Sequence, residues 1–255
     1  MTGLFAPAPP EGGGTSRGAS FAMEDGVVVA LDPAPETTVR VEGEPASFEP
    51  VERVLDALGV TASADVRPEV PLGHGFGASG AATLATALAA NAAMDGDRDR
   101  RELLQAAHEA EMAAGTGQGD VFIQDRGGLL WTAGDEPRRV EPDAAVEYVS
   151  RGGIDTSEML ADEEAMAAAR RSGSKHLSAI DAPLTMRSLA ERSRAYLEET
   201  GFATPFVEET VGRVEAAGGA GSMALFGDAV FAVDVDGLLA NRTRVSTTGA
   251  RLIDE

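Results

Sequence analysis

The chain has 255 residues, no cysteine and a formal net charge of −21, from 42 acidic and 21 basic residues. This length suits one large domain or two ordinary ones, and 43% hydrophobic residues can fill a core. The absence of cysteine excludes disulfides, thiolate metal sites and cysteine nucleophiles. Because the three histidines are far apart in sequence, any bound metal is expected to use oxygen ligands.

The acidity of the chain indicates which binding partners and which cellular environment to expect. Such a charge repels a nucleic-acid backbone, so we expect no nucleic-acid partner. Lys175 is the only lysine, and this composition resembles that of cytosolic proteins from salt-accumulating halophiles. The chain contains no apolar run of membrane-spanning length, and its start does not have the pattern of a signal peptide. We therefore expect a cytoplasmic protein with no membrane partner.

Hydrophobic patterning predicts mixed structure in the first half of the chain. Residues 1–25 are rich in Gly and Pro and have no helical period. The predicted elements that follow are strands at 26–31 and 37–43, a helix at 48–58, an extended segment at 64–70, helices at 79–94 and 100–114, and strands near 120–124, 128–132 and 145–149.

The second half begins with a different pattern. Its predicted elements are helices near 157–172, 184–200 and 205–217, then strands at 222–227 and 229–236. A boundary near 150–156 gives an N-terminal domain of residues 1–152 and a C-terminal domain of residues 153–255, both α+β. The connecting segment is short, so we expect the two halves to pack together.

A glycine-rich loop, Gly75-Phe-Gly-Ala-Ser-Gly80, follows the extended segment and matches G-x-G-x-x-G. A Walker loop is excluded because it needs a lysine directly after its last glycine. A dinucleotide site is disfavoured because a second helix, not a strand, follows the first helix. In addition, Pro68 disfavours a central strand before the loop.

The remaining interpretation is an anion trap at a helix start. Ser79 is expected to be the N-cap, and backbone amides and the helix dipole can hold a triphosphate without a lysine. A serine hydroxyl there can also bind the Mg²⁺ that accompanies ATP. The residues expected to bind ATP are Gly73, Gly75, Phe76, Gly77, Ala78, Ser79, Gly80 and Ala81.

This loop resembles the P-x-x-x-G-L-G-S-S-A-A signature of the GHMP small-molecule kinases, which include galactokinase, homoserine kinase and mevalonate kinase. Ala78 replaces the first serine of that signature, and Ser79 retains the second, which the family directs toward Mg²⁺ and phosphate. The resemblance implies ATP and Mg²⁺ as cofactors.

A second motif, AHEAEMAAGTGQGDV, covers residues 107–121. On a helix, His108 and Glu111 share a face that we expect to point inward, whereas Glu109 points roughly 100° away from His108. Asp120 follows a glycine-rich turn, from which its carboxylate can reach the helix and the loop. The segment resembles the E-x(n)-G-x-x-S-G-x-D stretch of mevalonate-type kinases and, more closely, the A-H-E-A-E and G-x-G-D elements of archaeal pantoate kinases.

The resemblance implies an α+β, two-domain GHMP kinase fold, with a ribosomal-protein-S5-like N-terminal domain and a smaller ferredoxin-like C-terminal domain. It implies that Asp120 is the catalytic base and that Ser79 and Glu111 hold Mg²⁺, with Glu109 as the alternative ligand. Ser16, His108 and Arg126 are the candidates for contact with the acceptor, which the resemblance implies is pantoate.

Alternatives remain open on the sequence alone. Within the family, the acceptor can be mevalonate, homoserine or shikimate. Outside it, the candidates are a relative that transfers another group and a non-catalytic nucleotide-binding module. The stretch from Ala6 to Pro10 lacks the early histidine of the pantoate kinases, so what forms that wall of the acceptor pocket is open. The resemblance also makes a homodimer a candidate assembly.

Overall fold

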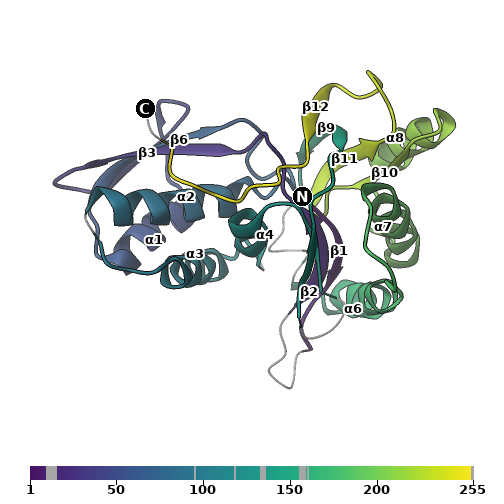
Figure 1. The fold of residues 1–255 in the computed structure, drawn as a ribbon, viewed down its shortest axis with the longest axis horizontal. Coiled ribbons are helices and arrows are strands. Elements are labelled where there is room, and N and C mark those ends of the chain that lie inside the picture. Colours follow the sequence, from purple (N-terminus) through teal and green to yellow (C-terminus); the bar gives the residue numbers. More distant parts are fainter. Residues whose placement is uncertain are drawn as a thin grey trace. The chain divides into compact units, whose positions relative to one another are not determined.

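The structure is a computed structural model, and it describes residues 1–9, 16–94, 96–117, 119–132, 136–154, 159 and 161–253. The chain forms two compact units (Figure 1). Unit 1 contains Met1–Glu24, Gly73–Phe76 and Gly127–Thr248, and unit 2 contains Asp25–Leu72, Gly77–Arg126 and Gly249–Glu255. The expected boundary after residue 152 falls inside strand β9 (Ala145–Gly153) of unit 1, and a division into domains at that point stays a prediction.

A four-stranded sheet with the order β3-β6-β4-β5 forms one layer of unit 2. Its strands are β3 (Val27–Pro33), β4 (Thr38–Val41), β5 (Glu44–Pro45) and β6 (Ala62–Pro68). The expectation that Pro68 disfavours a central strand was wrong. β6 lies between β3 and β4, and Pro68 is tolerated because it is the last residue of the strand.

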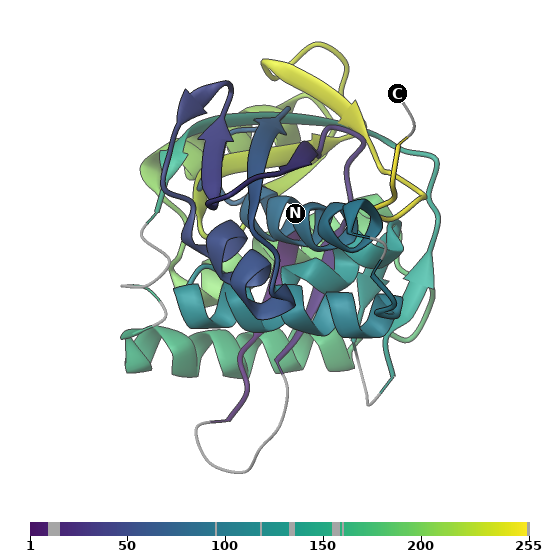
Figure 2. The same cartoon turned by 90° about the vertical axis from the view of Figure 1, so that its left-hand side faces the viewer.

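The helices of unit 2 lie on one face of this sheet (Figures 1 and 2). They are α1 (Glu49–Leu58), α2 (Ala78–Ala93), α3 (Arg100–Ala114) and α4 (Asp120–Arg126). Helix α2 consists mainly of small and apolar residues and is buried on most sides, as expected for a helix that packs against β3 and other helices at once. The next element after α2 among the described residues is helix α3 and not a strand, which confirms the prediction that a second helix follows the first.

The predicted strand near 120–124 was wrong, because these residues form helix α4. Val121 and Ile123 are both buried, so their alternating spacing imitates a strand. The turn at Gly119 has a φ of +116°, and the helix that follows it packs against α2 and α3. The structure of this short segment is therefore determined by its packing against α2 and α3, and not by the alternation of apolar residues in its sequence.

Unit 1 contains two sheets, with the orders β1-β2-β7-β8 and β10-β11-β9-β12. Besides β9, their strands are β1 (Thr2–Ala6), β2 (Arg17–Phe21), β7 (Leu129–Trp131), β8 (Arg138–Val140), β10 (Ala220–Met223), β11 (Gly227–Val233) and β12 (Asn241–Arg244). The sequence patterns missed β1, β2, β8 and β12. They also extended the two strands after residue 220 too far toward the C-terminus.

Three helices of unit 1, α6 (Glu163–Ser178), α7 (Met186–Thr200) and α8 (Pro205–Ala216), contact these strands. The first, over Glu163–Ser178, lies later in the chain than the predicted helix near 157–172, and it continues past a Gly/Ser pair at which a helix end was expected. Gly173 lies against β1, where an added Cβ would overlap Phe5 O. This glycine therefore allows close packing inside the helix instead of ending it.

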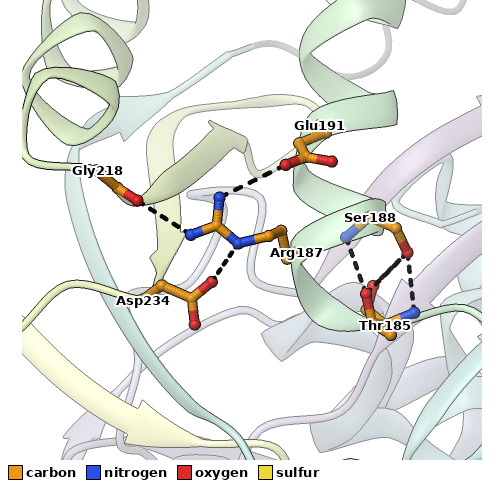
Figure 3. A network of polar contacts seen from close by, with 6 residues as sticks. All are labelled: Thr185, Arg187, Ser188, Glu191, Gly218 and Asp234. Atoms are coloured by element: carbon orange, nitrogen blue, oxygen red, sulfur yellow. Dashed lines mark hydrogen bonds and ion pairs between the residues drawn. The ribbon is translucent and has the colours of Figure 1, made fainter.

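Helix α7 is anchored at its N-terminus by a capping box between Thr185 and Ser188 (Figure 3). Beside it, Arg187 Nε donates to Asp234 Oδ2 over 2.6 Å, and Arg187 Nη2 donates to Gly218 O over 3.0 Å. One arginine thus joins the start of α7 to the segments that follow α8 and β11.

No helix in the described part of the chain is long and apolar enough to cross a membrane.

Candidate active site

The glycine loop ends at the first turn of α2. Gly77, not Ser79, is the N-cap of this helix, with φ 75° and ψ 17° in the left-handed region. A glycine adopts this conformation without steric cost, so the N-cap lies two residues earlier than predicted and the helix begins at Ala78. The Ser79 hydroxyl is consequently free from capping and can act elsewhere.

The N-terminus of α2 has the character of an anion site. It has no side-chain cap, and no acidic residue lies in its first turn. The backbone N–H groups of such a turn have no acceptor within the helix, and the helix dipole adds positive potential. These features fit a phosphate group, which agrees with the interpretation of the loop as part of an ATP site.

The first half of the loop, Gly73–Phe76, belongs to unit 1 and packs there against the turn between β10 and β11. A Cβ on Gly75 would lie 2.8 Å from both Ala224 O and Gly227 N, and a Cβ on Gly227 would overlap His74 O. His74 Nδ1 and Ser150 Oγ are hydrogen bonded at 2.7 Å. Close backbone packing thus explains these glycines in unit 1.

A buried carboxylate lies beside the first turns of α2 in unit 2. Glu111, on α3, is only 2% exposed and accepts three hydroxyl hydrogen bonds. Its Oε1 accepts from Ser79 Oγ at 2.9 Å and from Thr83 Oγ1 at 2.6 Å, and its Oε2 accepts from Thr116 Oγ1 at 2.9 Å. The structure therefore brings together the two residues predicted to hold a metal.

Two opposing effects act on the charge of Glu111. Burial raises the pKa of its carboxyl above the ordinary value, and the hydrogen bonds from Thr83, Ser79 and Thr116 oppose that rise. The negative charge of Asp120 makes a smaller contribution that also raises the pKa of Glu111. A cation bound beside Glu111 would favour its ionised form.

Asp120 is the first residue of α4 and is half-buried, after the turn at Gly119. Glu109 is exposed and accepts a hydrogen bond from Gln105 Nε2 at 2.7 Å, so it faces away from the cluster around Glu111. Of the two alternative metal ligands, only Glu111 therefore lies beside Ser79.

The three candidates for acceptor contact are in different places. His108 lies on α3, with its ring centroid 5.1 Å from that of Phe122, and its Nδ1 is buried without a hydrogen-bond partner among the described residues. Burial lowers the pKa of His108, against a smaller opposing effect of Glu109. Arg126 is the exposed last residue of α4. Ser16 directly precedes β2 and belongs to unit 1.

The residues present fit ATP and Mg²⁺, the cofactors that the sequence resemblance implies. Ser79 and Glu111 offer hydroxyl and carboxylate oxygens, the ligands that Mg²⁺ prefers, and Mg²⁺ takes few protein ligands because it retains water and phosphate oxygens. The described residues contain no group of three or more acidic or histidine side chains that could hold a metal alone. The uncapped start of α2 fits the phosphates of ATP.

The sequence patterns missed two members of the cluster, Thr83 and Thr116. Thr83 is fully buried, four residues after Ser79 on the same side of α2, and its hydroxyl makes the shortest of the hydrogen bonds to Glu111. That spacing was visible in the sequence. The contact of Thr116 depends on the turn at the end of α3 and left no comparable signal.

Comparisons with known proteins found similar sequences and structures. Residues 48–128 match the family described as GHMP kinases N terminal domain. The chain is 26% identical over 251 residues to a pantoate kinase of Methanospirillum hungatei, covering 91% of this chain and 84% of that protein. It is 36% identical to a mevalonate kinase of Archaeoglobus fulgidus over 102 residues, 39% of this chain and 35% of that protein.

A solved structure described as a phosphotransferase related to the CoA biosynthesis pathway has the same fold. It aligns with a TM-score of 0.83 and 22% identity, covering 98% of this chain and 94% of that chain. The α+β GHMP kinase fold predicted from the sequence is thereby confirmed. Residues 48–128 match the GHMP kinase N-terminal domain, and the chain as a whole has the GHMP kinase fold.

Proposed function

We propose that this protein transfers the terminal phosphoryl group of ATP to a hydroxyl group of pantoate. The observation that carries the kinase assignment is the hydrogen-bonded pair Ser79 and Glu111, coupled to Asp120, beside the uncapped start of α2. The choice of pantoate is supported by the similarity to a pantoate kinase over 91% of the chain.

Each group has a role that follows from its chemistry. The amides and dipole at the start of α2 bind the phosphates and stabilise negative charge on the transferred group. Ser79 and Glu111 would hold Mg²⁺, which supplies charge neutralisation at the phosphate oxygens when it is bound. Asp120 orients the acceptor hydroxyl and takes its proton.

The acceptor is held by side chains that make directional hydrogen bonds. Because burial lowers the pKa of His108, its ring is neutral at neutral pH and suits an acceptor hydroxyl better than a carboxylate. Arg126, which is exposed and cationic, is the candidate for the pantoate carboxylate. Ser16, in unit 1, stays a candidate from the sequence resemblance.

Mevalonate is the second candidate acceptor, because the match to a mevalonate kinase has the higher identity, 36%, although over 102 residues only. Both acceptors carry a carboxylate and a primary hydroxyl, and the groups identified above do not separate them. The experiment must therefore include both.

An ATP-consumption assay tests the proposal. Purified protein is incubated in molar KCl with ATP, Mg²⁺ and, separately, pantoate, mevalonate, homoserine or shikimate, with the Asp120→Asn variant as the inactive control. Molar salt is used because, with a net charge of −21, we propose a cytoplasmic protein of a salt-accumulating organism. Turnover with pantoate is the expected result. Rapid turnover with another acceptor and none with pantoate refutes the substrate, and no turnover with any acceptor refutes the kinase assignment.

The assembly is a separate proposal. We propose a homodimer, which light scattering of the purified protein in the same buffer measures directly. A mass equal to one chain of 26.3 kDa contradicts it.

A further inference from the structure

Gln124, in the middle of α4, is hydrogen bonded to the backbone of the glycine loop. Its Nε2 donates to Gly77 O over 2.5 Å. The same carbonyl accepts the N–H of Ala81 over 3.1 Å, the first hydrogen bond within α2. The Gly77 carbonyl oxygen therefore accepts two hydrogen bonds, one from the Gln124 side chain on α4 and one from the backbone of α2.

Holding this oxygen also orients an amide. The peptide that joins Gly77 to Ala78 is planar and trans, so the Ala78 N–H points opposite to the Gly77 carbonyl. Because that carbonyl points into the helix, the Ala78 N–H points out of its N-terminus, toward the place where an anion binds. Gly77 has φ 75°, and a glycine can readily rotate its peptide to another conformation. The bond from Gln124 opposes such a rotation.

The loop and α4 pack closely enough for this bond to be specific. A Cβ on Gly77 would lie 3.0 Å from Gln124 Nε2, and a Cβ on Gly80 would lie 2.9 Å from Gln124 Oε1 and 3.4 Å from Val121 Cγ1. Gln124 Oε1 is buried and has no hydrogen-bond partner among the described residues. An unpaired buried oxygen is costly, and the amide keeps this orientation because only its Nε2 can donate to a carbonyl.

Helix α4 is itself fixed from the other side by the C-terminal segment of unit 2. Ala250 N donates to Gln124 O over 2.7 Å, and an added Cβ on Gly249 would overlap Asp125 O. Arg100, on α3, is hydrogen bonded to α4 and to the C-terminal segment. Its Nε donates to Asp125 Oδ1 and its Nη2 donates to Ala250 O, each over 2.6 Å. The donor in Gln124 is therefore presented from an anchored backbone.

We propose that Gln124 is a positioning residue that locks the Gly77–Ala78 peptide with its N–H directed at a bound phosphate. Asp120 precedes Gln124 by four residues on the same short helix, so the two share a face of α4. One helix thus carries the proposed base and sets the phosphate-binding amide. The inference rests on the proposed function, in that the anion is taken to be a nucleotide phosphate.

Calorimetric titration with ADP and with adenosine tests this role. In Gln124→Met a side chain of similar length lacks the donor, and we expect ADP to bind about tenfold more weakly, the size of one lost hydrogen bond. Adenosine carries no phosphate, so its binding is expected to stay unchanged. The matched control is Gln105→Met on α3, where Gln105 donates to the exposed Glu109 instead. It is expected to bind both ligands as the wild type does.

A second variant covers the case in which the first fails to fold. Gln124→Glu keeps the size of the side chain but places a carboxylate against the Gly77 carbonyl. We expect weak ADP binding at neutral pH that recovers at lower pH, where the protonated carboxyl can donate, and no such recovery in the wild type. A purely structural role would not produce this pH profile. Equal ADP binding in wild type, Gln124→Met and Gln124→Glu across the pH range overturns the inference.

The failure of this inference and that of the proposed reaction are distinguishable. Wild-type protein that binds ADP but phosphorylates no acceptor refutes the reaction, while the comparison of variants still decides the role of Gln124. Wild-type protein that phosphorylates pantoate while both Gln124 variants bind ADP normally supports the reaction and refutes the positioning role.

Discussion

Ser79 Oγ donates a hydrogen bond to Glu111 Oε1 over 2.9 Å, and this bond joins the first turn of α2 to the last turn of α3. Because the serine proton is engaged by the carboxylate, the lone pairs of the serine oxygen stay available to a cation. The carboxylate is oriented in turn by Thr83 and Thr116. The pair therefore has the arrangement expected of ligands positioned before the metal arrives.

Replacing Glu111 with glutamine tests its metal-binding role. The amide keeps the size of the side chain and can still accept from Ser79 and Thr83, but it brings no negative charge to Mg²⁺. We expect roughly 10- to 100-fold more Mg²⁺ to be needed for half-maximal turnover. Turnover measured against Mg²⁺ concentration at saturating ATP gives the result, with Glu109→Gln as the exposed control. Equal Mg²⁺ dependence in Glu111→Gln and wild type would contradict the assignment.

Glu111→Gln is also expected to change how the free energy of unfolding depends on pH. Burial raises the folded-state pKa of Glu111 above the ordinary value of 4.5. As the pH rises from 4.5 through the raised pKa, Glu111 loses its proton in the unfolded chain before it does so in the folded chain. The free energy of unfolding therefore falls over this pH range. Glutamine cannot ionise, so Glu111→Gln is expected to become more stable relative to wild type over this window. Urea unfolding of both proteins from pH 4 to 8, without Mg²⁺, measures the difference. A difference that is constant or of opposite sign excludes the predicted pKa.

Asp120→Asn is expected to remove the proposed base with little effect on the nucleotide site. Loss of general base catalysis should lower kcat by about 10²–10⁴-fold. ADP binding should stay within a few fold of wild type, because the proposed phosphate-binding groups are the amides and dipole at the start of α2 and not the Asp120 carboxylate. Steady-state turnover and calorimetry measure the two quantities. A variant that retains full turnover would rule out Asp120 as the base.

The hydrophobic period of the sequence was enough to predict the positions of most helices and the order of α2 and α3. The pairing of Ser79 with Glu111 was expected only from the resemblance of their two motifs to a kinase family. It could not show that Gly77 is the N-cap, because a left-handed conformation depends on the surrounding loop. It also misassigned α4, where two buried residues imitate a strand. The contact of Gln124 with the loop depends on that helix and was missed for the same reason.

The only lysine of the chain forms an ion pair whose effect depends on pH. Hydrogen bonds from Lys175 and Ser172, with a smaller effect of His176, lower the pKa of Glu199 to about 2. A lowered pKa stabilises the fold above pH 4.5, and this contribution is lost as pH falls from 4.5 toward 2. Glu199→Gln should therefore destabilise the protein near neutral pH, and the deficit should shrink in acid.

The deficit is expected to be small, about 1 kcal/mol or less, because Lys175 is 67% exposed and water screens the pair. Urea unfolding between pH 3 and 7 measures it, with Glu198→Gln on the same helix as the control for removing a surface charge. A Glu199→Gln deficit that grows in acid contradicts the sign of the predicted shift.

Gly227→Ala tests whether the β10–β11 turn holds the first half of the glycine loop in place. An added methyl group at this position overlaps the carbonyl of His74, a backbone atom that can yield only if Gly73–Phe76 moves. Overpacking of this kind should lower the free energy of unfolding by about 1–3 kcal/mol and weaken ADP binding. The matched control is Gly212→Ala, at an exposed position in α8 where the added methyl meets no atom within 4 Å. There the helix should gain about 0.5–1 kcal/mol and ADP binding should not change. If Gly227→Ala is as stable as wild type and binds ADP equally well, the loop does not depend on this contact, and the packing of Gly75 against Ala224 must suffice to hold it.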